Sequence, residues 1–130
     1  MVRIGNIELG DFPLLLAPME DVSDPPFRAL CKEQGADMMY TEFISSDGLV
    51  YEAASSLKKL DIFDDERPVG IQYFGGQVES MVKAAHIVEA ANPDVIDINF
   101  GCPVAKVACK MAGAGLLQDI DKMIELTTAI

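Results

Sequence analysis

Short apolar runs alternate along this chain with segments in which apolar residues recur at helical spacing. The apolar runs cover residues 13–18, 36–43, 68–74 and 94–98, and helices are predicted over 25–34, 47–56, 77–91, 104–111 and 120–130. Nearly continuous apolar runs are typical of strands in a parallel sheet that helices cover. A small hairpin is predicted ahead of them, over residues 3–10.

Two of the helices have clear boundaries. Asp24 is a suitable N-cap for a helix that opens with Pro25 and Pro26, and Gly35 is a suitable end for it. The helix over 77–91 carries a core-facing stripe at the i, i+3, i+4, i+7 spacing, formed by Val78, Met81, Val82, Ala85 and Val88. These signals support the alternation of strands and helices.

Four strand–helix units define an α/β fold made of parallel βα units. Each unit takes roughly 30 residues, the usual length of such a repeat. A closed TIM (β/α)8 barrel takes about 250 residues, so the 130 residues of this chain correspond to roughly the first half of one. A complete four- or five-stranded doubly wound domain fits the same pattern, and the pattern alone leaves both open.

The charge distribution bears on possible partners. The formal net charge of −11 argues against nucleic-acid binding by the whole surface, because phosphate contacts need Lys and Arg. No acidic residue occurs between Asp97 and Asp119, however, and Lys106 and Lys110 lie in that interval with helical i,i+4 spacing. This segment is therefore predicted to present a small basic face.

The cysteines and the single histidine limit the possible chemistry. Cys31, Cys102 and Cys109 form no C-x-x-C pair, and only one histidine is present, so neither a metal site nor a disulfide framework is predicted. Cys31 and Cys109 are expected to be structural, and His86 is expected to be exposed on its helix. No apolar stretch reaches the roughly 18 residues of a membrane span. We therefore expect a cytoplasmic protein with no membrane partner.

Cys102 is the strongest functional candidate in the chain. It lies in the sequence Asn-Phe-Gly-Cys-Pro over 99–103, directly after the fourth apolar run. That position puts its thiol at the carboxyl end of a strand, where parallel α/β proteins hold their chemistry. No histidine is placed to activate it, which argues against a cysteine hydrolase.

Polar residues lie near the end of each of the four predicted strands or directly after it. In a barrel these strand ends converge on one mouth, and the residues concerned are Glu20, Asp21, Thr41, Glu42, Gln72 and Asn99. Two amides, carboxylates and a thiol suit a flat heterocycle with several donors and acceptors. Asp97 is expected to need a polar partner inside the sheet. The acidic run 64–66 is expected to be a solvated part of a surface connection.

Four segments in this order resemble the flavin-dependent tRNA-dihydrouridine synthases, most closely their bacterial B-type branch. They read LAPMEDVSDPPFR over 16–28, YTEFISS over 40–46, PVGIQYFG over 68–75 and DINFGCPV over 97–104, the last continuing to the Gly-Ala-Gly of 113–115. The resemblance covers nearly the whole chain. It implies an FMN-binding TIM barrel followed by a helical RNA-binding domain. It also implies reduction of the C5=C6 bond of uridines in tRNA, with NADPH as the reductant.

The resemblance also implies roles for individual residues. Pro18 and Met19 would line the flavin, and Gln72 would form a hydrogen bond with its ring. Asn99 would lie near the ring and the bound uracil. Cys102 would be the general acid that protonates C5, a task that suits a thiol because thiols are mostly protonated at neutral pH. Lys106 and Lys110, beside that pocket, would contact tRNA phosphate.

The resemblance identifies residues 1–130 as the N-terminal half of the FMN-binding barrel domain. The family's later flavin-contacting residues, its phosphate-binding loops and its RNA-binding domain find no counterpart in the chain. The isolated chain is therefore expected to be inactive, and its unpaired strand edges are expected to make it self-associate. Two other functions stay open: a dihydroorotate or dihydropyrimidine dehydrogenase-like flavin oxidoreductase, and a non-catalytic barrel fragment that acts as an assembly module.

Overall fold

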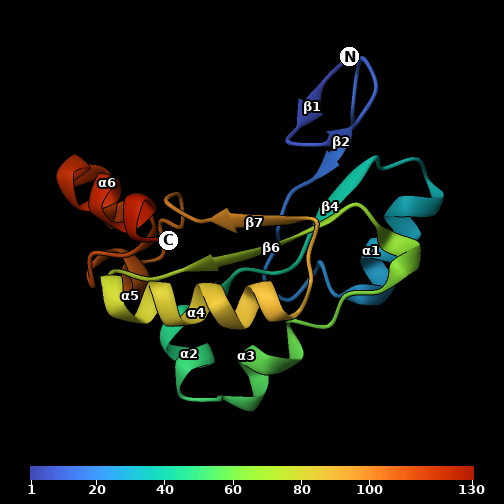
Figure 1. Ribbon diagram of the computed structural model, residues 1–130. Helices are drawn as coiled ribbons and strands as arrows, with labels where there is room; N and C mark the ends of the chain where they lie inside the picture. Colours follow the sequence, from blue (N-terminus) through green and yellow to red (C-terminus); the bar gives the residue numbers. More distant parts are fainter.

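A parallel sheet forms the centre of the molecule, which a computed structural model describes over residues 1–130. Its strands are β3 (Leu15–Leu16), β4 (Met38–Tyr40), β5 (Ile44–Ser45), β6 (Val69–Phe74) and β7 (Val95–Ile98). β6 pairs with β4, β5 and β7, while β3 pairs with β4, and all of these pairs are parallel (Figure 1).

β4 and β5 are two halves of one strand that a bulge interrupts. Met39 pairs with Val69 and Ile44 pairs with Tyr73, so the chain advances five residues here while β6 advances four. One extra residue on one strand is the definition of a β-bulge. The strand predicted over 36–43 is therefore shorter and broken, and the sheet runs in chain order, as it does in a barrel.

Helix α4 (Val78–Ala90) runs alongside β6 and β7 (Figure 1). The largest cluster of buried apolar residues lies between them, with Ile71 and Tyr73 of β6 against Met81 and Val88 of the helix. The predicted core-facing stripe is confirmed for Val78, Met81, Ala85 and Val88, whereas Ala84 takes the place in the core predicted for Val82. It fits the chemistry of an α/β layer, in which burial of apolar area is the main stabilising force.

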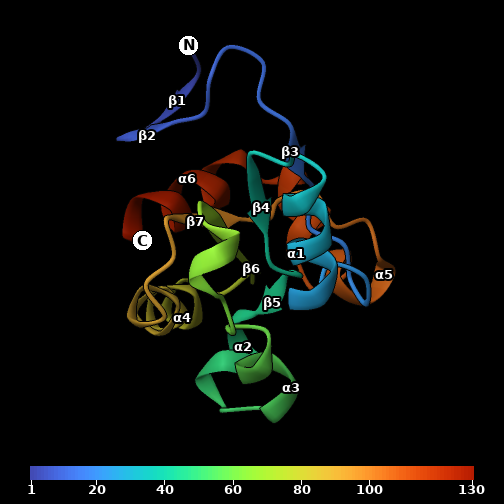
Figure 2. The same cartoon turned by 90° about the vertical axis from the view of Figure 1, so that its right-hand side faces the viewer.

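The N-terminal elements agree with the prediction. Helix α1 (Pro25–Glu33) begins after Asp24, whose carboxylate accepts a hydrogen bond from the backbone N–H of Phe27 at 3.1 Å. Strands β1 (Arg3–Ile4) and β2 (Ile7–Glu8) form the expected antiparallel hairpin. This hairpin projects away from the central sheet in both views (Figures 1 and 2).

The single helix predicted over 47–56 is wrong. The structure has two short helices, α2 (Ser46–Val50) and α3 (Ala54–Lys58), which are separated by a turn. Glu52 takes a left-handed conformation with φ of 54°, and the N–H of Ala53 then reaches the carbonyl oxygen of Gly48 at 2.8 Å. A non-glycine residue at positive φ ends a helix, and nothing in the local composition announces it.

Three helical segments follow β7. They are α5 (Ala105–Ala108), the 3-10 segment η2 (Gly113–Gln118) and α6 (Ile120–Ala129). The first is shorter than predicted, and the predicted turn at 113–115 is the start of η2. Leu126 of α6 is fully buried in the same core cluster as α4, so α6 closes the end of the core.

The α/β prediction is confirmed, since strand–helix units lie in parallel and in chain order, consistent with part of a TIM barrel. β3 and β7 are the two outer strands, and each pairs on one side only. None of the helices has both the length and the apolar character needed to cross a lipid bilayer.

Tyr73 gives this core a dependence on alkaline pH. Burial raises the pKa of its hydroxyl from 10.0 to about 12. Because the folded state holds the proton more tightly than the unfolded chain, this contribution to stability is complete below pH 10 and is lost as the pH rises through 12. We expect the free energy of unfolding, measured in denaturant between pH 9 and 12, to fall less steeply in Tyr73→Phe than in wild type. Equal slopes would contradict this prediction.

Candidate functional site

The polar residues near the ends of the strands lie at one edge of the sheet, where hydrogen bonds join them in two pairs. The N–H of Asp21, after β3, donates to Oε1 of Glu42 at 2.7 Å, which connects the first two strand ends. Nδ2 of Asn99, after β7, donates to Oε1 of Gln72 on β6 at 2.8 Å, which connects the other two. Parallel strands bring their carboxyl ends to the same edge, and in Figure 1 the arrowheads of β6 and β7 point toward α5.

A continuous chain of hydrogen bonds leads from this edge to Cys102. Oδ1 of Asn99 accepts from the backbone N–H groups of Gly101 and Cys102, both at 2.9 Å. Nε2 of Gln72 donates to Oδ2 of Asp97 at 2.5 Å. The expected partner for Asp97 is therefore Gln72, which lies opposite it in the register of β6 and β7. Asn99 fixes the turn that carries the cysteine.

Cys102 is held from its other side by η2. Its carbonyl oxygen accepts a hydrogen bond from the N–H of Ala114 at 3.0 Å. Gly113 has a φ of 52°, and a Cβ there would lie 2.9 Å from both the Cβ and the carbonyl oxygen of Cys102. Only glycine satisfies both the conformation and the space. The cysteine is 6% exposed and its thiol has no hydrogen-bond partner within the chain.

A cavity of about 610 Å³ opens next to this thiol. Its walls come from the carboxyl ends of β5 and β6, from the start of α4 and from α5; the lining residues include Phe43, Ser45, Asp47, Phe74, Gln77, Cys102, Lys106 and Lys110. Phe43 and Phe74 meet edge to face with ring centroids 5.5 Å apart. The volume is in the range of cavities that hold cofactor-sized or nucleoside-sized groups.

The charged groups at the cavity differ in how they are satisfied. Glu20 forms an ion pair with Lys59, and Asp47 accepts a hydrogen bond from the hydroxyl of Ser80 at 2.6 Å. Lys106 and Lys110 are exposed and form no ion pair with the chain. The predicted basic face therefore exists at the cavity, with two ammonium groups available to an anion.

The other predicted residues lie near this cavity without lining it. Gln72 and Asn99 are connected to it through the backbone of Cys102. Pro18 and Met19 are half-buried in the turn after β3, where the N–H of Met19 donates to the hydroxyl of Ser23 at 2.8 Å. The roles predicted for these four residues toward a flavin stay predictions.

Tyr40 lies on the same face of the sheet as Gln72 and Asp97. Burial raises the pKa of its hydroxyl above 10.0, and the charge of Asp97 raises it further. Its ring occupies the space above Gly70, where a Cβ would lie 2.5 Å from Cδ1 of the tyrosine. The tyrosine therefore stays neutral at physiological pH, beside the carboxylate that ends the hydrogen-bond chain.

The sequence of this chain matches a known family along most of its length. The family described as Dihydrouridine synthase (Dus) matches residues 15–130. The chain belongs to the dihydrouridine synthase family. The resemblance inferred from four short segments is thereby confirmed.

Individual members of the dihydrouridine synthase family give the same result. The tRNA-dihydrouridine synthase B of Pseudomonas putida is 42% identical over 130 residues, which cover 99% of this chain and 38% of that protein. Proteins of the same name from Yersinia pestis and Pseudomonas aeruginosa are each 37% identical, over 99% and 100% of this chain and 40% and 39% of theirs. The chain thus spans about two fifths of the length of these curated relatives.

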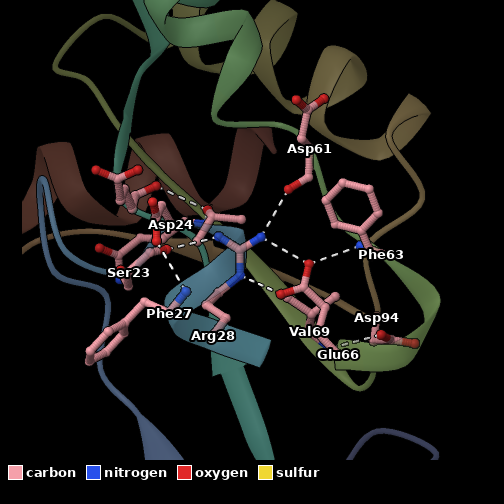
Figure 3. A network of polar contacts seen from close by, with 12 residues as sticks. Ser23, Asp24, Phe27, Arg28, Asp61, Phe63, Glu66, Val69 and Asp94 are labelled. Carbon is pink, nitrogen blue, oxygen red and sulfur yellow. Dashed lines mark hydrogen bonds and ion pairs between the residues drawn. The ribbon is translucent and has the colours of Figure 1, made fainter. Parts of the chain in front are cut away.

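A buried ion pair between Arg28 and Glu66, which the sequence analysis missed, lies next to the turn that follows β3 (Figure 3). Nε and Nη2 of Arg28 donate to the two carboxylate oxygens of Glu66 at 2.5 and 2.9 Å. The same guanidinium donates to the carbonyl oxygens of Ser23 and Asp61 at 2.8 and 2.9 Å. Both charged residues are 1% exposed. Arg28 thus ties the turn that carries Met19 and Ser23 to the connection before β6.

The prediction that the whole acidic run 64–66 is solvated is therefore wrong for one residue. Asp64 and Asp65 are exposed, whereas the 3-10 turn η1 (Asp64–Glu66) rotates Glu66 inward. Oε1 of Glu66 also accepts the N–H of Phe63 at 2.8 Å. The sequence does contain a signal for this pair, since Arg28 lies in the middle of an amphipathic helix. A guanidinium buried there needs a carboxylate as its partner.

His86, Cys109 and Cys31 lie outside the candidate site. His86 is exposed on α4, as predicted. The prediction that Cys109 is structural is wrong, because this cysteine is exposed after the short helix α5 ends. Cys31 is half-buried rather than part of the core, because its neighbour Leu30 is 53% exposed and that helix face is not covered.

Proposed function

We propose that the full-length protein containing this chain reduces uridine to 5,6-dihydrouridine in tRNA, and that Cys102 donates the proton. The observation that carries the proposal is the placement of Cys102, whose peptide is held by hydrogen bonds from both sides at the carboxyl edge of the sheet and which lines a cavity. The name shared by the relatives, tRNA-dihydrouridine synthase, supports the substrate. A tRNA substrate implies a cytoplasmic location.

The donor and acceptor set at the sheet edge fits an FMN ring. After its bonds to Asp97 and Asn99, Gln72 retains one Nε2 hydrogen and one lone pair on Oε1. An amide with one spare donor and one spare acceptor is suited to the edge of a flavin. Gln72, Asn99, Pro18 and Met19 are the residues of this chain that would hold it.

The chemistry that FMN supplies when bound, after reduction by NADPH, is a hydride for C6 of the uracil. The C5=C6 bond then has an electron pair left at C5, which takes the proton of the Cys102 thiol. Asn99 and Ala114 hold the peptide of Cys102 in place while the proton moves. The uridine must leave its stack to enter the cavity, at a cost of roughly a few kcal/mol that pocket contacts offset.

Mass spectrometry of tRNA tests the proposal directly. Purified full-length protein with NADPH is expected to add two hydrogens to specific uridines of tRNA from a strain that lacks dihydrouridine. Free uracil and orotate are the comparison substrates. Reduction of the free bases but not of tRNA would favour a dihydroorotate or dihydropyrimidine dehydrogenase-like enzyme. Reduction of none would favour a non-catalytic assembly module.

Lys106 and Lys110 are proposed to bind tRNA phosphate. Replacing both with alanine is expected to weaken tRNA binding and to lower the slope of log K against log salt by about 1.5, because each phosphate contact releases counterions. Filter binding at several salt concentrations measures this slope. Lys83→Ala and Lys122→Ala form the control pair, since both lysines are already paired with glutamates. A slope that is unchanged in the double variant would contradict the role.

We propose that the 130 residues are the first half of the barrel and that the remaining part of the full-length protein completes the flavin site. The isolated chain is then expected to be purified without flavin absorbance, whereas the full-length protein is yellow. The outer strands β3 and β7 each have one unpaired edge, and such edges promote association. Sedimentation of the isolated chain is expected to show dimers or larger species at micromolar concentration. A colourless full-length protein or a monomeric chain would contradict the respective expectation.

A further inference from the structure

The hydrogen-bond chain at the sheet edge has only one consistent direction. The N–H groups of Gly101 and Cys102 can only donate, so Asn99 must present Oδ1 to them, as it does at 2.9 Å. Its Nδ2 then faces Gln72, which must present Oε1. Nε2 of Gln72 therefore needs an acceptor on its far side, and Asp97 provides one at 2.5 Å. The N–H groups at one end of these hydrogen bonds and the carboxylate of Asp97 at the other end therefore require the same orientation of the two amides.

Asp97 has no other task in the proposed reaction. It lies on β7 opposite Gln72 in the strand register, away from the residues that line the cavity. An ionised carboxylate accepts hydrogen bonds and never donates them, and its bonds to N–H groups are short and strong. The side chain can therefore hold the amide of Gln72 in one orientation only.

We propose that Asp97 is a positioning residue, whose carboxylate orients the amides of Gln72 and Asn99 and thereby fixes the peptide that carries the Cys102 thiol. This inference rests on the proposed function, in which that thiol protonates the substrate. Without the acceptor, the amide of Gln72 is free to rotate and to present Nε2 to Nδ2 of Asn99. Two donors then face each other, and the hydrogen bond between Asn99 and Gln72 is lost. A displacement of about 1 Å at a reacting group lowers a rate by about 100-fold.

The test compares two substitutions of Asp97 in the full-length protein. Asp97→Leu has a similar size and removes the acceptor, whereas Asp97→Asn removes the charge and keeps an acceptor oxygen. The measurement is single-turnover oxidation of the prereduced flavin by tRNA. We expect Asp97→Leu to be slower by about 100-fold with an unchanged KM for tRNA. We expect Asp97→Asn to retain most of the rate.

Asp94→Leu is the matched control. The carboxylate of Asp94 also accepts a hydrogen bond from β6, from the N–H of Val69 at 2.8 Å. Asp94 lies at the opposite end of the strands from Asp97. This variant is expected to lose stability and to keep the single-turnover rate. A purely structural role of Asp97 would make the two leucine variants alike.

A second pair of variants applies if Asp97→Leu does not fold. Gln72→Glu faces Asp97 with another carboxylate and is expected to be slow. Adding Asp97→Asn supplies a donor at position 97, restores a bond between the two side chains and keeps an acceptor toward Asn99. The double variant is therefore expected to be faster than Gln72→Glu alone. A double variant that is no faster would overturn the proposal.

The flavin-free protein offers a readout that does not depend on turnover. The thiol of Cys102 is 6% exposed while the chain of bonds is intact. Modification of Cys102 by iodoacetamide, followed by peptide mass spectrometry, is expected to be faster in Asp97→Leu than in wild type and in Asp94→Leu. Equal rates in all three would overturn the proposal.

The variants of Cys102 and Asp97 distinguish an error in the proposed function from an error in the role of Asp97. If wild-type protein does not oxidise its flavin with tRNA, or if Cys102→Ala is as fast as wild type, the proposed function is wrong and the role of Asp97 falls with it. If Cys102→Ala is slow while Asp97→Leu is as fast as wild type, only the role of Asp97 is wrong. The same conclusion follows if Asp97→Asn is as slow as Asp97→Leu.

Discussion

Replacing Cys102 with alanine in the full-length protein is expected to slow the reduction of tRNA by about 10² to 10⁴-fold, the usual contribution of a general acid. The thiol lies in a fixed peptide beside the cavity and has no partner within the chain. Alanine removes the proton donor and leaves that peptide unchanged. Stopped-flow oxidation of the prereduced flavin by tRNA measures the step itself.

Cys109→Ser is the matched control for this experiment. Cys109 lies seven positions further along the same segment but is exposed and outside the cavity lining. Its replacement is expected to leave the rate unchanged. Flavin content and thermal stability of Cys102→Ala should match those of wild type, because the alanine Cβ keeps its packing against Gly113. A Cys102→Ala protein that reduces tRNA at the wild-type rate would contradict the proposed mechanism.

The parts of the fold that could be predicted from the sequence are those in which local signals and tertiary packing agree. The helix 77–91 has an apolar stripe of which all residues but Val82 match the core contacts of α4. The helix after Asp24 has a capping residue and prolines that fix its first turn. The bulge between β4 and β5 and the break at Glu52 arise from strand pairing and backbone strain, which leave no periodic signal.

The candidate site could be predicted to a similar extent and for a similar reason. A cysteine directly after an apolar strand is visible in the sequence, because strand ends in parallel sheets collect functional groups. The direction of the hydrogen-bond chain through Asn99, Gln72 and Asp97 is not visible, since it depends on the register between β6 and β7. The exposure of Cys109 could not be predicted either, because it follows from the short length of α5.

The burial of Glu66 is the clearest case in which local composition fails to predict whether a residue is exposed. Three acidic residues in a row suggest a solvated segment, and two of them are indeed exposed. The third is buried because Arg28 sits 38 positions earlier in the sequence and comes to lie beside it in the fold. Only a long-range contact distinguishes Glu66 from its neighbours, so the pair became apparent only in three dimensions.

Breaking this pair is expected to have the largest effect on stability of any single substitution in the chain. Arg28→Met leaves the carboxylate of Glu66 buried without its partner, and it also leaves the carbonyl oxygens of Ser23 and Asp61 without a donor. Removing one partner of a buried pair costs about 3–5 kcal/mol. Denaturant unfolding, with the midpoint and the slope both recorded, measures the loss.

The double variant Arg28→Met/Glu66→Leu shows how much of that loss comes from the uncompensated charge. With both charges replaced by apolar side chains of similar size, the chain is expected to be more stable than Arg28→Met alone, because the desolvation of an unpaired carboxylate is relieved. Lys83→Met, which breaks an exposed pair with Glu79, should leave the midpoint where it is. The comparison also needs the single variant Glu66→Leu. If the losses of unfolding free energy in Arg28→Met and Glu66→Leu simply add in the double variant, Arg28 and Glu66 act independently. The turn with Met19 and Ser23 would then owe its position to its own hydrogen bonds rather than to the ion pair beneath it.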